Sequence, residues 1–283
     1  MLLSSNSGLY SGRASLPRYT MLEAVEFFHK SGFEAFDINF SATIYNPPKK
    51  VRETVLDGNW QKNVDEIGSL CAYHKIKINT SHLPFFKYAN KAAIPEEEYN
   101  YNQSFVYRSL DAAIRLGVKW TVVHMTSDLE AAIEYIRPLC EYSTPHGLGI
   151  AVENVPSASL EALNEAVDRL HSQGYLVGIC YDTGHANVAG LNQKAAIHTL
   201  GDRIKMLHIH DNFGKDQHQV PFCGTVNWTD VMHALAETGY RGDFNFEVNA
   251  TNIPEATRTE HAAYLVSLGR HLIDIYNNRL NEL

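Results

Sequence analysis

The sequence contains few cysteines. Only four of its 283 residues are cysteine, and they are widely spaced at Cys71, Cys140, Cys180 and Cys223. No CxxC pair occurs, so the spacing of a cysteine-rich zinc site or of a disulfide framework is missing. We therefore expect reduced, mostly buried thiols in a cytoplasmic protein.

Long hydrophobic runs and a positive charge balance are also missing. No apolar run approaches the ~18 residues that a transmembrane helix needs, and the start, MLLSSNSGLYSG, lacks the basic and then apolar regions of a signal peptide. We therefore expect no membrane partner. The formal net charge of -8 gives no general attraction to nucleic acid, although a local basic groove stays open.

Eight short apolar, β-branched runs recur along the chain, and stretches with helical periodicity lie between them. The helical stretch 20–32 stops at Gly32, and the stretch 159–174 has Ser159 as a candidate N-cap. The predicted strands cover residues 2–7, 34–40, 76–82, 119–125, 148–154, 177–183, 204–211 and 243–249.

Eight strand–helix units predict a parallel α/β fold, a (β/α)8 TIM barrel that forms a single domain over residues 1–283. A doubly wound open sheet is the alternative. It is disfavoured because no glycine-rich phosphate-binding turn follows the first strand. For the same reason we expect no nucleotide or organic cofactor.

Ionisable residues gather where the predicted strands end, which is the catalytic end of such barrels. Each one alone is compatible with a packing, capping or solvated role. Together they would bring imidazoles and carboxylates from six successive strands to one mouth. These residues are His82, His124, Glu153, Asp182, His185, His208, His210, Asp216, His218 and Glu247.

Carboxylates that face one another across a barrel mouth repel unless a positive charge lies between them. A divalent cation meets this need most simply. A mixture of carboxylate and imidazole ligands suits Mn, Zn, Co or Mg, and the lack of a cysteine ligand argues against a structural zinc centre.

The motifs VENVP, YDTGHANVAG, LHIHDN followed by KDQH, and FEVN occur in this order. Over nearly the whole chain the sequence resembles the xylose-isomerase-like TIM-barrel superfamily. That superfamily includes sugar isomerases and epimerases, and also the zinc-dependent endonucleases of the endonuclease IV type (AP endonuclease family 2).

The sugar epimerase branch implies one divalent metal held by Glu153, Asp182, His208 and Glu247. It also implies substrate contacts from His185 and His218, and His210 is a further candidate for substrate contact or for support of a ligand. The endonuclease branch implies up to three zinc ions, with His82, His124, His185, Asp216 and His218 as additional ligands. All of these positions carry the required residue types.

The loops favour the sugar branch. The segment LPFFKYANKAAIPEEEYNYN after His82 is aromatic and then acidic, where a DNA-binding loop should be basic. The one basic patch near a barrel loop is PPKKVR, residues 47–52. The loop after strand seven offers Lys215 where epimerases often have an arginine. Aromatic residues that could line a sugar pocket, or wedge into DNA, are Phe85, Phe86, Phe213, Phe222 and Trp228.

The resulting hypothesis is a divalent-metal-dependent isomerase or epimerase of a small sugar or keto-polyol. Glu153 and Glu247 would exchange a proton with the carbon between them through a metal-stabilised enediolate. An endonuclease IV-type phosphodiesterase is the alternative, and a sugar-binding barrel without catalysis is a third. The acidic balance and a long C-terminal helix near residues 255–278 are compatible with a homo-oligomer.

Overall fold

The computed structural model describes residues 1–10, 19–40, 55–85, 95–250 and 252–283. The basic patch at residues 47–52 and the predicted pocket residue Phe86 lie outside these ranges. None of the described helices is long and apolar enough to cross a membrane.

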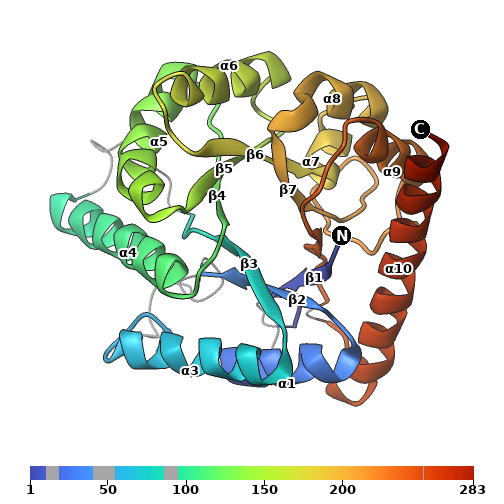
Figure 1. The fold of residues 1–283 in the computed structure, drawn as a ribbon, viewed down its shortest axis with the longest axis horizontal. Helices are drawn as coiled ribbons and strands as arrows, with labels where there is room; N and C mark the ends of the chain where they lie inside the picture. The colour runs from blue at the N-terminus through green and yellow to red at the C-terminus, as the bar shows by residue number, and fades with distance from the viewer. Residues whose placement is uncertain (11–18, 41–54, 86–94, 251) are drawn as a thin grey trace.

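Eight parallel strands form one sheet that curls into a ring (Figure 1). The order β7-β6-β5-β4-β3-β2-β1-β8 places β7 and β8 at the two ends. Just beyond β7, Ile209 bridges to Phe246 and closes the barrel. The TIM-barrel prediction is therefore confirmed. The strands are β1 Leu3–Asn6, β2 Ala35–Asn39, β3 Lys77–His82, β4 Trp120–His124, β5 Gly149–Glu153, β6 Val177–Asp182, β7 Ile204–His208 and β8 Phe244–Phe246.

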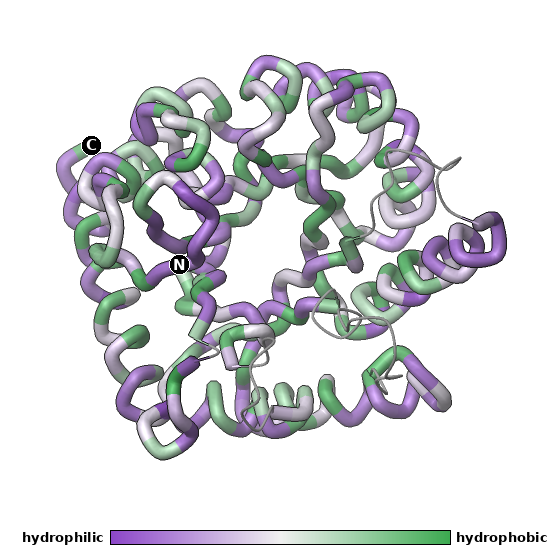
Figure 2. Tube along the Cα trace, turned by 180° about the vertical axis from the view of Figure 1, so that it is seen from behind, coloured by the Kyte–Doolittle hydropathy of each residue, from purple (hydrophilic) through white to green (hydrophobic). Residues whose placement is uncertain are grey.

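Helices surround the strands (Figure 1). Figure 2 shows hydrophobic and hydrophilic residues alternating along them, as expected for helices with one face on a core. Ser159 caps α6 as predicted, and its side chain accepts from the Ala162 N–H. The α-helices are α1 Met21–Ser31, α3 Trp60–His74, α4 Glu96–Arg115, α5 Leu129–Ser143, α6 Leu160–His171, α7 Thr183–Val188, α8 Gln193–Leu200, α9 Trp228–Glu237 and α10 Arg258–Glu282. The 3₁₀ helices are η2 Thr144–His146, η3 Gly201–Arg203 and η4 Glu255–Thr257.

The core has an outer and an inner part. The large outer core lies between strands and helices, and it includes Phe28, Phe36 and Leu110. A small inner core of Val122, Ala151, Cys180 and Met206 fills part of the barrel itself. Three of the four cysteines are buried and only Cys223 is exposed, in agreement with the expectation of mostly buried thiols.

Candidate metal centre

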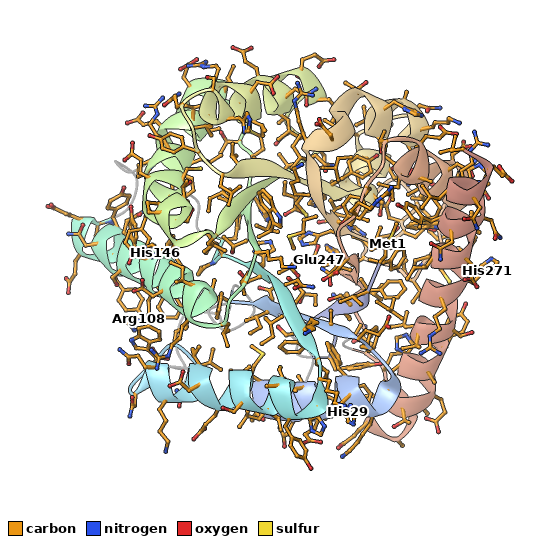
Figure 3. All side chains as sticks on the ribbon, in the orientation of Figure 1. Met1, His29, Arg108, His146, Glu247 and His271 are labelled. Carbon is orange, nitrogen blue, oxygen red and sulfur yellow. The ribbon has the colours of Figure 1, made fainter. Side chains whose placement is uncertain are left out.

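The carboxyl ends of the strands carry the predicted ionisable residues. Glu153, Asp182 and His208 are the last residues of β5, β6 and β7, and His82 and His124 are the last residues of β3 and β4. Glu247 directly follows β8 and lies near the middle of the ring of strands (Figure 3). Because all strands are parallel, these side chains meet at one end of the barrel.

Four of these residues surround one point. Glu153, Asp182, His208 and Glu247 each place a ligand atom within 4.8 Å of the ligand atoms of the other three. Nδ1 of His208 lies 3.1 Å from a carboxylate oxygen of Glu153 and 3.1 Å from one of Glu247. Metal–ligand bonds of about 2.0–2.2 Å place opposite donors about 4 Å apart. The four donors therefore enclose a space that suits a single cation.

The electrostatics of this group also favour a cation. Burial alone would raise the pKa of Glu153, but the His124 and His208 imidazoles hold it well below its usual range. Burial alone would likewise lower the pKa of His185, but Asp182 and Glu153 raise it to about 11. Without a metal, protonated imidazoles are thus needed to balance the carboxylates, and a divalent ion can replace that positive charge.

A second group lies beside the first on β3 and β4. His82, His124 and Glu153 also have ligand atoms within 4.8 Å of one another. Nδ1 of His82 donates to the Leu83 carbonyl at 2.7 Å, so neutral His82 presents a lone pair at Nε2. That atom lies 3.1 Å from Nε2 of His124, which in turn lies 3.0 Å from Glu153 Oε2.

A third group occupies the loop after β7 and the start of α7. Nδ1 of His185 and Nδ1 of His218 donate to the backbone carbonyls of Asn154 and Glu247, at 2.9 and 2.7 Å. Their Nε2 atoms lie 3.9 and 3.1 Å from the Asp216 carboxylate. A fixed Nδ1 hydrogen leaves Nε2 as the atom that can bind a metal or accept from a substrate hydroxyl.

His210 lies in the interior, next to Asp182 and His218. Its side chain is fully buried, and its Nε2 lies 3.0 and 3.1 Å from the two carboxylate oxygens of Asp182. Its ring stacks on His218, with 3.9 Å between the centroids. Gly184 makes room for it, since a Cβ at this glycine would lie 1.9 Å from Cε1 of His210. This position suits support of Asp182, the second of the two roles that the sequence left open for His210.

Backbone capping orients the ligands of β5 and β6. Asp182 is the N-cap of α7 and accepts from the His185 N–H at 2.6 Å. The buried Asn154 side chain accepts from the Asp182 N–H at 2.7 Å and donates to its carbonyl at 3.0 Å. The ends of the two strands are therefore tied together by main-chain and side-chain bonds.

Sequence reasoning missed the residue that organises the loop between β7 and α9. The buried Asp211 carboxylate accepts from the backbone N–H groups of Asn212, Val226 and Phe222 and from the indole N–H of Trp228. Asp211 directly follows the motif His208–His210, so the sequence drew attention to it. The spacing of the ionisable residues nevertheless did not distinguish a loop anchor from a metal ligand.

The aromatic residues of the predicted pocket divide into two groups. Trp228 does not belong to the pocket, because it begins α9, is 1% exposed and is bonded to Asp211. Phe85 packs against His124, with ring centroids 4.6 Å apart, and so lies beside the group of His82, His124 and Glu153. Phe213 and Phe222 are exposed in the loop after β7, where Lys215 is exposed as well.

The sequence is similar to that of a known protein over about half of the chain. An uncharacterised protein, y4fM of Sinorhizobium fredii, is 34% identical over 154 residues, which is 49% of this chain and 50% of that protein. The chain thus matches about half the length of that relative.

Two solved structures show the same fold over nearly the whole chain. A D-tagatose 3-epimerase-like protein has a TM-score of 0.74 and 22% identity, with 99% of this chain and 100% of that chain covered. The D-psicose 3-epimerase of Clostridium cellulolyticum H10, solved with D-tagatose, has a TM-score of 0.74 and 16% identity, with 96% and 99% covered. At these identities the likeness concerns the fold alone. The family model described as xylose isomerase-like TIM barrel matches residues 25–268, and the chain therefore belongs to that family.

Proposed function

We propose that this protein is a divalent-metal-dependent epimerase or isomerase that moves a proton next to the carbonyl group of a small sugar or keto-polyol. One observation carries the proposal. Four donors of suitable chemistry lie within 4.8 Å of one another, and two of them are glutamates whose oxygens each lie 3.1 Å from Nδ1 of His208. An epimerase-like protein and an epimerase among the structures of the same fold also support this proposal.

Glu153, Asp182, His208 and Glu247 would hold the metal. When bound, a divalent cation supplies Lewis acidity that makes a hydrogen next to the carbonyl easier to remove. The oxygens of Glu153 and Glu247 both approach Nδ1 of His208, from the ends of β5 and β8. We propose that the substrate binds with its reacting carbon between these two carboxylates. One glutamate would take the proton and the other would return one.

The neighbouring histidines would bind the substrate. The side chains of His185 and His218 are 11% and 26% exposed, so they border the accessible part of the site. Their Nδ1 hydrogens are engaged by carbonyls, so Nε2 is the ring atom that would form a hydrogen bond with a substrate hydroxyl. Phe85 beside His124 would offer an apolar contact to the carbon side of a sugar.

Exchange of substrate hydrogen with solvent deuterium tests the proposal. Ketoses, aldoses and keto-inositols incubated with the protein and Mn²⁺ in D₂O should gain deuterium at the carbon next to the carbonyl. We expect Glu153→Gln and Glu247→Gln to lose at least about 10³-fold of this exchange and to remain folded. Glu165→Gln, at an exposed position on α6, is the matched control and should exchange normally. Near-normal exchange by both site variants would refute these roles.

A phosphodiesterase with several metals is the second candidate, and one observation favours it. Besides the four-ligand group, the groups His82–His124–Glu153 and His210–Asp216–His218 have ligand atoms within 4.8 Å of one another. Metal analysis and incubation with a duplex that contains an abasic site discriminate the two candidates. About one metal per chain with deuterium exchange supports the sugar enzyme, whereas about three zinc ions with strand cleavage support the phosphodiesterase.

A further inference from the structure

The interior of the barrel below the metal ligands is polar on one side. Interiors of TIM barrels are dominated by bulky branched side chains. The strands β4 to β7 place only the apolar side chains of the inner core described above at this level. The strands β1, β2, β3 and β8 instead place polar residues inside, and four of these, each no more than 5% exposed, carry side-chain atoms without a hydrogen-bond partner among the described residues. We call this group the interior polar cluster, and it consists of Ser4, Asp37, Thr80 and Asn245.

The strand register makes the cluster continuous and connects it to the metal ligands. Ser4 pairs with Asn245, and Asp37 pairs with Thr80. Asn245 lies two residues before Glu247, so both side chains point into the barrel. The Ile209 N–H donates to the Asn245 carbonyl at 2.9 Å, which places the preceding residue, His208, next to Asn245.

Many polar atoms of this region lack a hydrogen-bond partner among the described residues. They are Oγ of Ser4, Oδ1 of Asp37, Oγ1 of Thr80, both amide atoms of Asn245 and Nε2 of His208. The Thr80 hydroxyl lies close enough to the Asp37 carboxylate to lower the pKa of Asp37, but the pair does not reach full hydrogen-bond geometry. Leaving a buried polar group unsatisfied costs about 1–3 kcal/mol, so such a concentration calls for a bound ligand.

The chemistry of these atoms identifies that ligand. The Asp37 oxygen can only accept from an ionised carboxylate, whereas the Asn245 amide nitrogen can only donate. Nε2 of His208 must also donate if Nδ1, which faces Glu153 and Glu247, binds the metal. A cation would satisfy the acceptors alone. Water both donates and accepts, and it commonly fills polar spaces inside proteins.

We propose that the interior polar cluster binds ordered water that joins the Asp37 carboxylate to the Nε2 hydrogen of His208, which makes Asp37 a positioning residue for the metal centre. This inference rests on the proposed metal site. Histidines that bind metals usually donate their other ring hydrogen to a carboxylate, a carbonyl or a water, which fixes the ring and increases the basicity of the ligand atom. The Cys180 thiol lies beside the His208 ring, but no described carboxylate or carbonyl accepts from Nε2 of His208 directly.

The electrostatic surroundings of Asp37 are consistent with this role. Burial raises the pKa of Asp37, and His208 is the largest of the groups that oppose this rise. The second oxygen of Asp37 accepts from Nδ2 of Asn6 at 3.0 Å, so the carboxylate is held in place from β1. The carboxylate therefore has one anchored oxygen and one oxygen that faces the cluster.

The affinity for Mn²⁺ of the full chain, measured from the electron paramagnetic resonance signal of free Mn²⁺, tests the inference. Asp37→Asn keeps the shape and removes the charge, and we expect it to weaken Mn²⁺ binding about 10–100-fold, the usual effect of losing the outer partner of a ligand. Asp243→Asn is the matched control. Asp243 accepts from Asn79 at 2.8 Å before the start of β8, at the opposite end of the barrel, so its variant should bind as the wild type does. Binding by Asp37→Asn within twofold of wild type would overturn the inference.

A second variant covers the case in which Asp37→Asn does not fold. Asn245→Leu has a similar volume, and it removes two unsatisfied groups beside His208. It should weaken Mn²⁺ binding at least about fivefold while the metal-free protein keeps its stability. Wild-type affinity for Mn²⁺ in Asn245→Leu would overturn this inference but would leave the proposed metal centre standing. Absence of Mn²⁺ binding by the wild type would overturn the metal centre, and the inference with it.

Discussion

Asp211→Asn should destabilise the protein strongly, because one carboxylate accepts hydrogen bonds from four donors, three of them buried. Oδ1 of Asp211 accepts from the N–H groups of Asn212 and Val226 at 2.8 and 3.1 Å. Oδ2 accepts from the Phe222 N–H and the Trp228 indole, both at 3.0 Å. An asparagine keeps one acceptor oxygen and turns an NH₂ group toward the other two donors. Two charge-assisted bonds of about 1.5–3 kcal/mol each are lost, so the expected cost is about 3–6 kcal/mol.

Urea unfolding of the metal-free protein measures this cost. The same change should also reduce turnover, since Asp211 anchors the loop that carries Asp216 and His218. Asp230→Asn is the matched control, because Asp230 accepts a side-chain bond from Asn227 at an exposed position and should lose less than about 1 kcal/mol. A loss below about 1 kcal/mol for Asp211→Asn, together with normal turnover, would refute the role of Asp211 as the anchor of the loop.

Three further predictions concern packing, charge and the metal. Gly184→Ala should cost about 2 kcal/mol in urea unfolding, because its Cβ would collide with the buried His210 ring, whereas Gly68→Ala meets only the end of a leucine side chain at 3.1 Å and should be tolerated. Hydrogen bonds from Arg279, Lys194 and His198 outweigh burial and lower the pKa of the Glu237 carboxyl to about 2. The stabilisation that Glu237 contributes is therefore present above about pH 4.5 and is lost as the pH falls toward 2. Glu237→Gln should therefore lower the free energy of unfolding by about 1 kcal/mol at pH 7 and leave it nearly unchanged at pH 2, and equal losses at both values would contradict this. Removal of metal with EDTA should abolish turnover and lower Tm, and Mn²⁺ at a thousandfold excess over its Kd should restore about 4 kcal/mol; unchanged turnover after complete metal removal would speak against the mechanism.

Much of the fold was predictable because hydrophobic residues are spaced differently in strands and in helices. Segments with the two spacings alternate eight times along the chain. The ends of the strands were less predictable. β7 stops at His208 and β8 at Phe246, although the apolar pattern runs on, because the ladder between these strands reduces to a bridge at Ile209. Pairing across the barrel depends on residues far apart in the chain, and no local period encodes it.

The cluster of candidate ligands, Glu153, Asp182, His208 and Glu247, was predictable to the extent that parallel strands bring their carboxyl ends together. That rule was enough to place Glu153 and Glu247 on one mouth. The role of Asp211 and the burial of Trp228 were not predictable, since both depend on how a loop folds back on itself. The interior position of Asp37 was equally hard to predict, because Asp37 is the one acid of the strand Ala35–Asn39 and no periodic pattern of acids marks it.

Anomalous X-ray scattering at the manganese edge, from crystals of the full chain grown with Mn²⁺, tests the central claim most directly. We predict a peak that lies about 2.0–2.3 Å from one side-chain donor atom of each of Glu153, Asp182, His208 and Glu247. A fully occupied Mn²⁺ site elsewhere, with no peak among these four side chains, would contradict the account.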